Sequence, residues 1–506
     1  MKTNNHNRLS QIAVLGLIAG LAVALFASPS PASWDDGLRH LTMARTMQVD
    51  GITQTWSHFF YGGYLATHAV NPWFLADVSY IPFTFLPDIV ALKTYALVAA
   101  AALLFVLRKL IQPMEIPEVW KTILLATLFS SPTFLGRLEF GRPFVWQTVF
   151  CLLILDAASR QKYRIAGVVM IVATLFSHLF VFPLLFGMVG AAWIASTGKW
   201  RMGALFGSSA FAGTAIGMLL HPAPAAYASY IATVFFRTAL NAHTVTQVPE
   251  LLPGALVDLS PALLGCMLAF LAIGHVALGK RFPLKDFHAH GGTLVLTISG
   301  AMLIAYLAAW ARIIDILWPM EIVLAGTLCA SLRPTVEELI AAPKKFLGRS
   351  PQILLASLLI TVPVAAVSSS ALHNVRETKA HDLSQLSSIT EIPPGSRVLN
   401  IDWRLCAAMI LVNPELRFAT GLDNTFTWIE DERAYALLEA LRRSDPPLSI
   451  ADAHASLTEL LKRLPADFVV IGESSAHVLP AIRTMPNLRE VYESGGAVHV
   501  FRVEQQ

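Results

Sequence analysis

WDDGLRHLTMARTMQ (residues 34–48), WSHFFYGGYLATHAVNPWF (56–74) and YIPFTFLP (80–87) lie within one stretch of the chain, Trp34–Pro87. This stretch follows one apolar segment directly and precedes all the others. It holds two adjacent acids, a helical pattern and many aromatic residues. Because it connects segments long enough to cross a bilayer, it is predicted to be an active-site loop on a membrane scaffold.

The first part of this stretch has the periodicity of an amphipathic helix. One face carries apolar residues at three- and four-residue spacing, Trp34, Leu38, Leu41 and Ala44. The neighbouring face carries Asp36, Arg39, His40 and Met43. Residues three and four apart share a face of a helix, so we expect the first face on the membrane interface and the second facing solvent or ligand.

Two interpretations of the acid pair Asp35 and Asp36 stay open. Ser33 with Asp36 fits the start of a helix, where each carboxylate gains about 0.3 to 1 kcal/mol from the helix dipole. A cap requires only one acid, however. It also does not explain why Arg39 and His40 follow one turn later at the edge of an apolar segment, so a functional role is favoured.

Composition excludes an ordinary soluble protein. The chain has 506 residues, of which 55% are hydrophobic and 14% charged, with a mean hydropathy of +0.57. These values are typical of a polytopic membrane protein. No basic stripe with interleaved aromatic residues is present, so nucleic acid is not an expected partner. The four cysteines form no disulfide or zinc pattern.

Charge is divided unevenly along the chain. The 13 basic and 18 acidic residues from His373 onward give that part a net charge of −5, whereas the rest carries +8. We therefore expect a membrane domain over residues 1–370, with a large first outer loop at 30–87, and a water-soluble domain over 371–506. Alternating strand and helix patterns predict an α/β fold for the soluble domain, with strands near 397–402, 467–472, 488–492 and 497–503 and helices near 428–443, 456–464 and 474–484.

About eleven apolar segments could be transmembrane helices. They lie near 11–29, 88–107, 119–135, 143–158, 165–178, 179–195, 203–220, 256–278, 291–310, 313–331 and 351–369. Lys and Arg collect in every second connection, which by the positive-inside rule predicts a cytoplasmic N-terminus and an extracytoplasmic C-terminal domain. The first segment resembles the apolar region of a signal peptide, and we expect it to stay as an anchor.

Two motifs give the chain a resemblance to a known superfamily. Asp36-x-x-x-His40-Leu41 lies in the first outer loop, and Arg312–Gly326 (RIIDILWPMEIVLAG) has an R-x-x-x-x-x-x-P helix start. In both motifs and in its layout over residues 10–370, the chain resembles the GT-C membrane glycosyltransferases. These include oligosaccharyltransferase catalytic subunits, protein mannosyltransferases and aminoarabinose transferases of lipid A.

The resemblance implies transfer of a sugar from a polyprenyl-phosphate carrier at the outer face of a bacterial inner membrane. The catalytic residues it implies are Asp36, Asp35 and His40. Asp36 would be the base or the carboxylate that orients the acceptor, and the adjacent charge of Asp35 would raise one of the two pKa values. The acceptor leaves no sign in the sequence.

The phosphate of such a donor requires cations. Four arginines are expected at outer membrane edges, where guanidinium groups can bind phosphate in bidentate fashion: Arg137, Arg142, Arg237 and Arg312. The alternative for each is snorkelling at the interface. Arg312 is favoured because its position matches the superfamily motif.

Metal use stays open between Mg²⁺ or Mn²⁺ and none. Glu139 and Glu250 lie in outer loops that correspond roughly to the acid-bearing loops of oligosaccharyltransferases. Residues 244–247 (TVTQ) resemble the T-[IV]-x-E motif of those enzymes, but Gln247 replaces the acid. This replacement disfavours metal-dependent modification of asparagine.

Four further residues are candidates for substrate contact: His178, Tyr61, Tyr64 and Trp73. A histidine inside an apolar segment often makes a hydrogen bond between helices, although polar residues in membranes tend to be functional. Aromatic rings stack on sugars, but they also form the interfacial belt of membrane proteins. Both alternatives stay open.

Two other functions compete with glycosyl transfer. A flippase or transporter for lipid-linked saccharides would carry ionisable residues near the membrane midplane. In this sequence they cluster at the ends of the apolar segments instead, as Asp156, Asp258 and Asp315 do, which favours interfacial chemistry. An inactive membrane scaffold is the third hypothesis, and the acid pair disfavours it.

Overall fold

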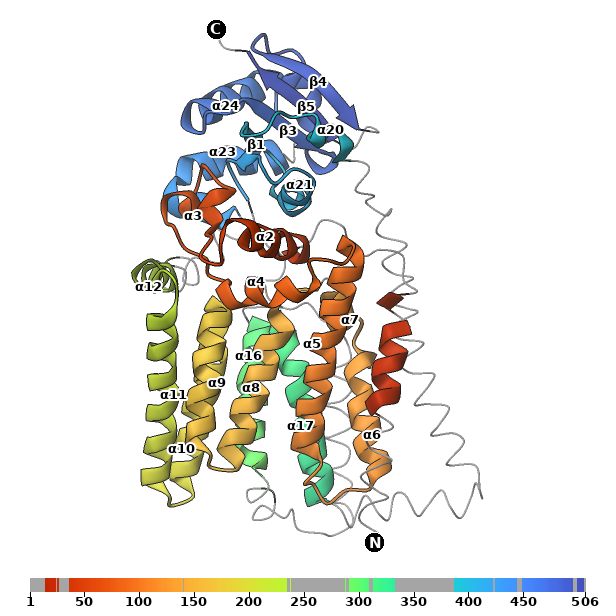
Figure 1. The fold of residues 1–506 in the computed structure, drawn as a ribbon, viewed down its shortest axis with the longest axis vertical. Coiled ribbons are helices and arrows are strands. Elements are labelled where there is room, and N and C mark those ends of the chain that lie inside the picture. Colours follow the sequence, from red (N-terminus) through yellow and green to blue (C-terminus); the bar gives the residue numbers. More distant parts are fainter. Residues whose placement is uncertain are drawn as a thin grey trace. The chain divides into compact units, whose positions relative to one another are not determined.

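The chain divides into two compact units (Figure 1). The helical unit comprises Met1–Pro29, Lys93–Leu219 and Pro249–Glu377, and the mixed unit comprises Ser30–Leu92, Leu220–Val248 and Thr378–Gln506. The computed structural model describes residues 14–23, 25–26, 36–139, 141–233, 237, 287, 291–308, 313–332, 386–421, 424–443, 448–494 and 498–504. The mixed unit thus combines the first loop with the C-terminal residues.

Apolar helices build the helical unit. They are α5 (Asp88–Ile111), α6 (Glu118–Thr127), α7 (Pro132–Glu139), α8 (Phe144–Ser159), α9 (Tyr163–Phe176), α10 (Val181–Ser196), α11 (Trp200–Leu220), α16 (Gly292–Ala308) and α17 (Ile314–Ser331). Almost every residue of α17 is buried, because α6, α7, α8 and α16 pack around it. Among the described residues, four helices are long and apolar enough to span a membrane: Asp88–Ile111, His178–Ser196, Trp200–Leu220 and Ile314–Ser331.

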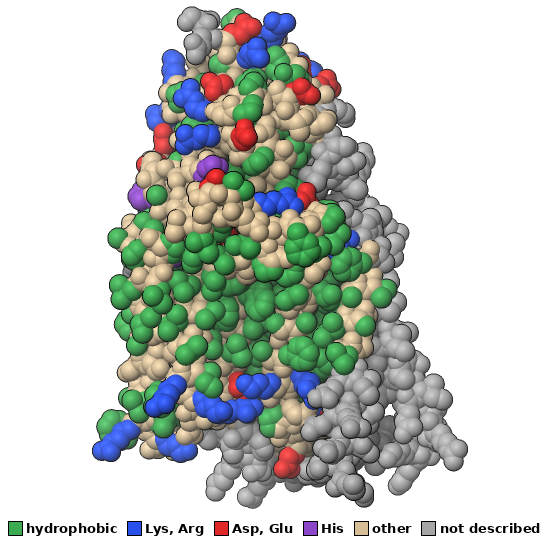
Figure 2. Space-filling model, in the orientation of Figure 1, with side chains coloured by type: hydrophobic (Ala, Val, Ile, Leu, Met, Phe, Trp, Pro, Cys, Tyr) green, Lys and Arg blue, Asp and Glu red, His purple; other side chains and the backbone are tan. Residues whose placement is uncertain are grey.

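Basic residues gather at one end of the helical unit. Lys109 and Arg160 both contact the carboxylate of Asp156, at 2.8 and 2.7 Å, and Lys199 Nζ donates to Gln161 Oε1 at 3.1 Å. Figure 2 shows a row of Lys and Arg side chains beside a broad hydrophobic surface. The sequence predicted that the basic residues of these three connections lie on one side of the membrane domain. The structure confirms that they lie at one end of the helices.

One predicted segment is interrupted where a residue adopts extended backbone. Residues 119–135 form α6, a short 3₁₀ turn and α7, because Ser131 is extended and its Oγ accepts from Phe134 N at 3.1 Å. Pro132 then occupies the first turn of α7, where no main-chain donor is needed. Glu139, which was expected in an outer loop, is the last residue of α7.

A second extended residue, Ser177 (φ −166°), separates α9 from α10, which fixes the boundary between the predicted segments 165–178 and 179–195. The segments predicted near 256–278 and 351–369 lie outside the described residues. The total of eleven therefore stays a prediction.

A five-stranded sheet forms the centre of the mixed unit. Its strands are β1 (Arg397–Asn400), β2 (Arg417–Phe418), β3 (Phe468–Gly472), β4 (Leu488–Ser494) and β5 (Val498–Val503), in the order β2-β1-β3-β5-β4. β1 is parallel to β2 and β3, and β5 is antiparallel to β3 and β4. The strands lie where the sequence predicted them, except that the two-residue β2 was missed.

Helices accompany this sheet. They are α20 (Ser387–Thr390), α21 (Cys406–Val412), α22 (Thr425–Glu430), α23 (Glu432–Arg443), α24 (Ile450–Arg463) and α25 (Leu479–Ile482). Apolar residues of β1 and β3 pack on α23, α24 and α25 in one core, which includes Leu399, Ile471, Leu438 and Leu457. The predicted helix 428–443 is divided at Asp431, which is extended (φ −144°). The boundary predicted at residue 370 lies outside the described residues and stays a prediction.

The first loop joins this sheet by main-chain hydrogen bonds. Phe418 N donates to Phe59 O at 2.8 Å, Tyr61 N donates to Phe418 O at 3.0 Å, and Phe60 forms a parallel bridge with Phe418. Gly62 follows this pairing, and a Cβ there would lie 2.4 Å from Ala419 O. Residues 59–61 therefore pair with β2 as a neighbouring strand would, although the two segments are more than 350 residues apart in sequence.

Helix α2 (Asp36–Asp50) is buried on both sides, so the predicted amphipathic arrangement is wrong. Helix α21 packs on it, and so does α4 (Phe74–Tyr80). The face expected to meet solvent or ligand is buried, with exposed fractions of 2% for Arg39, 1% for His40 and 0% for Met43. Two further helices in the described part of the mixed unit are α3 (Tyr64–Thr67) and α12 (Pro224–Ala232).

Gly62→Ala should destabilise the mixed unit, because its Cβ would overlap the main-chain oxygen of Ala419 and the paired segments would have to separate. We expect a loss of about 1 to 3 kcal/mol, seen as a lower melting temperature of the purified protein. Gly136→Ala in α7 is the control, since nothing lies within 4 Å of the added Cβ and alanine favours helix. Equal melting temperatures for Gly62→Ala and wild type would contradict the close contact.

Candidate active site

A buried hydrogen-bond network connects α2 and α4. His40 Nδ1 lies 2.5 Å from Asp77 Oδ1, and Asn71 Nδ2 donates to Asp77 Oδ2 at 2.7 Å. The exposed fractions of His40, Asp77 and Asn71 are 1%, 0% and 2%. Because an isolated buried carboxylate is costly, these two partners are what allow Asp77 to be fully buried.

Asn71 extends the network to two other segments. Its Oδ1 accepts from Trp56 Nε1 and from Trp73 N, both at 3.0 Å. Its main-chain oxygen accepts from His221 Nε2 at 2.9 Å, and His221 Nδ1 accepts from Ala223 N at 3.1 Å. The first loop and the residues after α11 are thereby held together within the mixed unit.

Aromatic rings surround His40. Tyr80 stacks with it at 6.0 Å between centroids and 10° between planes, and Trp56 and Trp73 meet it edge-on at 6.4 and 5.9 Å. The guanidinium of Arg39 lies 4.1 Å from the Trp73 ring centroid and 5.3 Å from that of Trp56. Cation–π contacts of this kind are strengthened by burial. His40 therefore has a fixed ring orientation.

The predicted catalytic acids lie at the start of this helix. Asp36 is the first residue of α2, and its side chain lies outside the described residues, as does all of Asp35. His40 follows Asp36 by four residues, which is one turn along the same face of a helix. The network around His40 and Asp77 thus supports the turn of α2 that carries Asp36.

A second polar contact lies in the helical unit. Arg137 Nε donates to Asp315 Oδ1 at 2.6 Å, with exposed fractions of 9% and 4%. Thr148 Oγ1 donates to Asp315 O at 2.9 Å, and Trp318 Nε1 donates to Leu128 O at 3.1 Å. These contacts tie α7, α8 and α17 together near the start of α8, whereas the basic row lies at its other end.

The remaining predicted phosphate ligands are distributed between the units. Arg142 is half-buried in the turn between α7 and α8 of the helical unit. Arg237 belongs to the mixed unit, where it donates to Ile429 O at 2.8 Å and to Glu432 at 3.3 Å and lies 5.1 Å from the Trp428 ring centroid. Outside the described residues lie Arg312, Glu250 and the side chain of Glu139.

The predicted substrate contacts have defined surroundings. Tyr61 packs against the core of the sheet, and burial raises the pKa of its phenol. Tyr64 stacks with His68 at 3.9 Å between centroids, and Trp73 is buried beside His40. His178 is buried in the turn between α9 and α10. Packing thus accounts for Tyr61 and Trp73, and their contact with substrate stays a prediction.

Sequence reasoning missed Asp77, Asn71 and His221. Asp77 is a single acid within an apolar and aromatic run (WFLADVSYI), and that isolation was a usable signal. Asn71 precedes Pro72, so it looked like an ordinary turn residue. Nothing in the sequence around His221 indicated its partner 150 residues away.

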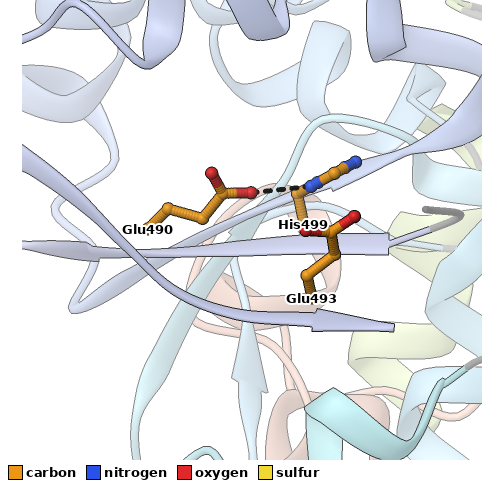
Figure 3. Close-up of side chains that lie close together, drawn as sticks. All are labelled: Glu490, Glu493 and His499. Atoms are coloured by element: carbon orange, nitrogen blue, oxygen red, sulfur yellow. Dashed lines mark hydrogen bonds and ion pairs between the residues drawn. The ribbon is translucent and has the colours of Figure 1, made fainter. Parts of the chain in front are cut away.

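Among the described residues, one group of side chains has metal-ligand chemistry. Glu490, Glu493 and His499 lie on the adjacent strands β4 and β5, with ligand atoms within 4.8 Å of one another (Figure 3). Arg483 contacts both oxygens of Glu490, at 2.9 and 3.1 Å, and this guanidinium lowers the pKa of Glu490. His499 Nδ1 lies 2.7 Å from the same carboxylate. A cation already neutralises the group, which identifies it as an ion-pair network.

The mixed unit should become less stable as pH falls through the range where histidines titrate. Burial lowers the pKa of His221, and its Nδ1 accepts from a main-chain donor, so protonation is disfavoured in the folded state. Its contribution is therefore complete above the ordinary pKa of about 6.5 and is lost as pH falls toward the lowered value. Melting temperatures between pH 7.5 and 5 measure this effect.

His221→Gln is the comparison, because glutamine offers one donor without titrating in this range. We expect its melting temperature to change less between pH 7.5 and 5 than that of wild type. Parallel curves for the two proteins would show that His221 does not titrate as its surroundings indicate.

Comparison with known proteins identifies the class of fold. Residues 70–300 match the model of glycosyltransferase family 87. No curated protein sequence matches the chain. The fold is similar to that of the oligosaccharyltransferase AglB from Archaeoglobus fulgidus, whose structure was solved with an inhibitory peptide and a dolichol-phosphate. The TM-score is 0.56 at 13% sequence identity, and the match covers 93% of this chain and 70% of that chain.

Two other proteins have similar structures. The arabinofuranosyltransferase AftD from Mycobacteria gives a TM-score of 0.54 at 14% identity, covering 99% of this chain and 42% of that chain. ArnT from Cupriavidus metallidurans in the apo state gives 0.53 at 14% identity, covering 99% and 98%. The same protein bound to undecaprenyl phosphate gives 0.50 at 14%, covering 97% of each chain. The expected resemblance is therefore confirmed: the chain has the fold of these GT-C proteins, and its residues 70–300 match the model of glycosyltransferase family 87.

Proposed function

We propose that the chain transfers a sugar from a polyprenyl-phosphate carrier to an envelope acceptor, on the outer face of a bacterial inner membrane. The match to glycosyltransferase family 87 supports glycosyl transfer. Two structures of similar fold hold polyprenyl phosphates, dolichol-phosphate in AglB and undecaprenyl phosphate in ArnT, and this supports the class of donor. The acceptor is a lipid, glycan or protein that offers a nucleophilic group.

Asp36 acts as the base or orients the acceptor in this proposal. For an acceptor hydroxyl, the oxygen forms a bond to the anomeric carbon while the bond between that carbon and the carrier phosphate oxygen breaks. The phosphate leaves with the electron pair, and the acceptor proton passes to the Asp36 carboxylate. Attack opposite to the leaving group inverts the anomeric configuration. The N-terminal end of α2 stabilises a carboxylate at this position.

The buried pair of His40 and Asp77 is the single observation that carries this assignment. It lies one turn from Asp36 and leaves α2 little freedom to move, since Asn71, Trp56 and His221 are bonded into the same network. Such rigidity supports catalysis, because a catalytic carboxylate must be held in position before the substrate arrives. A helix cap alone would not need a buried ionic network beneath it.

Arginines are proposed to bind the donor phosphate. A guanidinium has five N–H donors, so the ion pair of Arg137 through Nε is compatible with binding phosphate oxygens through its terminal nitrogens. Asp315 fixes the direction of this side chain. Arg142, Arg237 and Arg312 stay candidates for the same role.

A divalent cation, Mg²⁺ or Mn²⁺, would be held by outer-loop acids such as Glu139 and Glu250. Among the described residues near α2, both oxygens of Asp77 already have partners, so this carboxylate does not fit a metal. We assign no step to a metal. The basic row of the helical unit is proposed to face the cytoplasm, with the N-terminus on that side and the C-terminal residues outside.

Asp36→Asn should abolish transfer while leaving the protein folded, because asparagine keeps the shape but neither accepts the proton nor carries the charge. Mass spectrometry of lipid extracts and envelope glycans should show the loss of one sugar modification and accumulation of its polyprenyl-phosphate sugar. Asp50→Asn, at the exposed other end of α2, is the control and should behave like wild type. Unchanged glycans and carrier lipids with Asp36→Asn at normal protein level would reduce Asp36 to a helix cap.

Asp77→Asn should lower the turnover rate at least about tenfold without removing Asp36, because the neutral amide no longer fixes one tautomer and orientation of His40. As a positioning residue, Asp77 should affect kcat more than KM and shift the pH profile of transfer. Asp88→Asn breaks a half-exposed ion pair with Arg45 and serves as the control. A fall in activity that only follows protein abundance, with an unchanged pH profile, would limit Asp77 to stability.

A further inference from the structure

Polar residues gather where the three parallel strands of the mixed unit end. Asn400 is the last residue of β1, and Asp402 follows it by two. Thr420 follows β2, and Ser474 follows β3. Parallel strands bring their carboxyl ends to one edge of a sheet, and ligands of open α/β sheets bind at that edge. We call these four side chains the strand-end cluster.

Hydrogen bonds connect the strand-end cluster. Thr420 Oγ1 donates to Asn400, with distances of 3.1 Å to its main-chain oxygen and 3.2 Å to Oδ1. Ser474 Oγ donates to Asp402 Oδ2. Asn400, Asp402 and Thr420 are buried, with exposed fractions of 0%, 3% and 1%. Ser474 is exposed, so the cluster reaches from the buried sheet to the surface.

One buried donor of the cluster is unsatisfied. The Nδ2 atom of Asn400 has no hydrogen-bond partner, although the side chain is completely buried. Leaving an amide nitrogen unpaired in the interior lowers stability, so such groups are usually satisfied by water or a ligand. An apolar residue of similar size would be more stable here. A ligand that accepts from Asn400 Nδ2 would satisfy this donor.

Close packing surrounds the buried members of the cluster, and Ser474 is its exposed member. A Cβ at Gly421 would lie 2.1 Å from Phe60 Cε1 and 2.6 Å from Cys406 Sγ, so the β2 side of the edge is closely packed. A Cβ at Gly472 would lie 2.6 Å from Leu405 Cδ1, so the end of β3 is closely packed too. Ser474, two residues after Gly472, is exposed, and Trp403, which follows Asp402 in sequence, is half-buried. Carboxylate, amide and hydroxyl groups are the groups that bind the hydroxyls of a pyranose, and a tryptophan near them can stack on its apolar face.

The strand-end cluster is also linked to α2. Helix α21 begins at Cys406, four residues after Asp402, and packs against α2. Phe60, which touches Gly421, stacks with Trp56 at 6.3 Å between centroids. Trp56 in turn donates to Asn71, a partner of Asp77. Continuous contacts within the mixed unit thus lead from the cluster to the helix that begins with Asp36.

We propose that the strand-end cluster is a saccharide subsite that holds the acceptor of the transfer reaction. This assignment rests on the proposed function, because it supplies the partner that the donor site lacks. A phosphate-bearing ligand is disfavoured by the carboxylate of Asp402, and the sequence has no phosphate-binding glycine loop. Neutral hydroxyl groups match the cluster, since Asn400 Nδ2 can donate to them and Asp402 can accept from them.

Binding of methyl glycosides to the purified full-length protein tests this subsite. The panel contains hexosides, pentosides and N-acetylhexosaminides, and the detergent carries no sugar head group that could compete. We expect saturation-transfer NMR to detect at least one glycoside with wild type. Asn400→Leu should weaken its affinity about tenfold or more. Its melting temperature should stay equal or rise, because Thr420 keeps its bond to the main-chain oxygen of residue 400.

Trp403→Ala is a second variant that changes a half-buried side chain and does not depend on the fate of Asn400. It should also weaken glycoside binding. Trp200→Ala, which removes a 65% exposed tryptophan from the helical unit, is the matched control and should bind like wild type. With the natural acceptor, Asn400→Leu should raise KM for the acceptor and leave kcat nearly unchanged.

The outcomes separate this subsite from the proposed function. No glycoside binding by wild type, or equal binding by wild type, Asn400→Leu and Trp403→Ala, overturns the subsite even if Asp36→Asn abolishes transfer. Glycoside binding that depends on Asn400 in a chain that transfers no sugar supports a saccharide site and overturns the transferase assignment. Binding retained by Asp36→Asn together with lost transfer supports both.

Discussion

The buried contact between His40 and Asp77 is the interaction on which the mixed unit depends. A carboxylate with no exposed surface loses its hydration, and a 2.5 Å contact with His40 and a 2.7 Å bond from Asn71 replace it. Each partner belongs to a different segment, so satisfying one charge fixes α2, α4 and the turn at Asn71 together. Removing either partner would leave the Asp77 carboxylate buried without compensation. The position of α2 and the stability of the mixed unit therefore depend on the same contacts.

Main-chain pairing extends this unit to the C-terminal residues. The segment Phe59–Tyr61 lies along β2, and Gly62 permits its close approach to Ala419. The first loop is therefore part of the same core as the sheet. For a transferase this arrangement has a clear consequence: α2, which begins with Asp36, and the strand ends, which are proposed to hold the acceptor, are parts of one compact body.

The ion pairs of the helical unit lie near the two ends of α8. Basic residues and Asp156 occupy one end of its helices, and the pair of Arg137 and Asp315 lies near the start of α8, away from them. Between these ends α8 and α10 present mainly apolar side chains. Charges placed at helix ends avoid the cost of burial in the hydrocarbon core and are available to a phosphate at the interface. Glu321 departs from this distribution, because it is buried inside α17.

The sequence by itself determined the apolar helices, the end at which their basic connections gather, strands β1, β3, β4 and β5, and the GT-C resemblance through Asp36 and His40. These features follow from local periodicity, charge and a short motif. Only the tertiary structure decided the partners of His40, because Asp77 lies 37 residues away and His221 lies 150 residues from Asn71. It also decided that α2 is buried on both sides. Periodicity reports which residues share a face of a helix, but what packs on that face depends on segments distant in sequence, here α4 and α21.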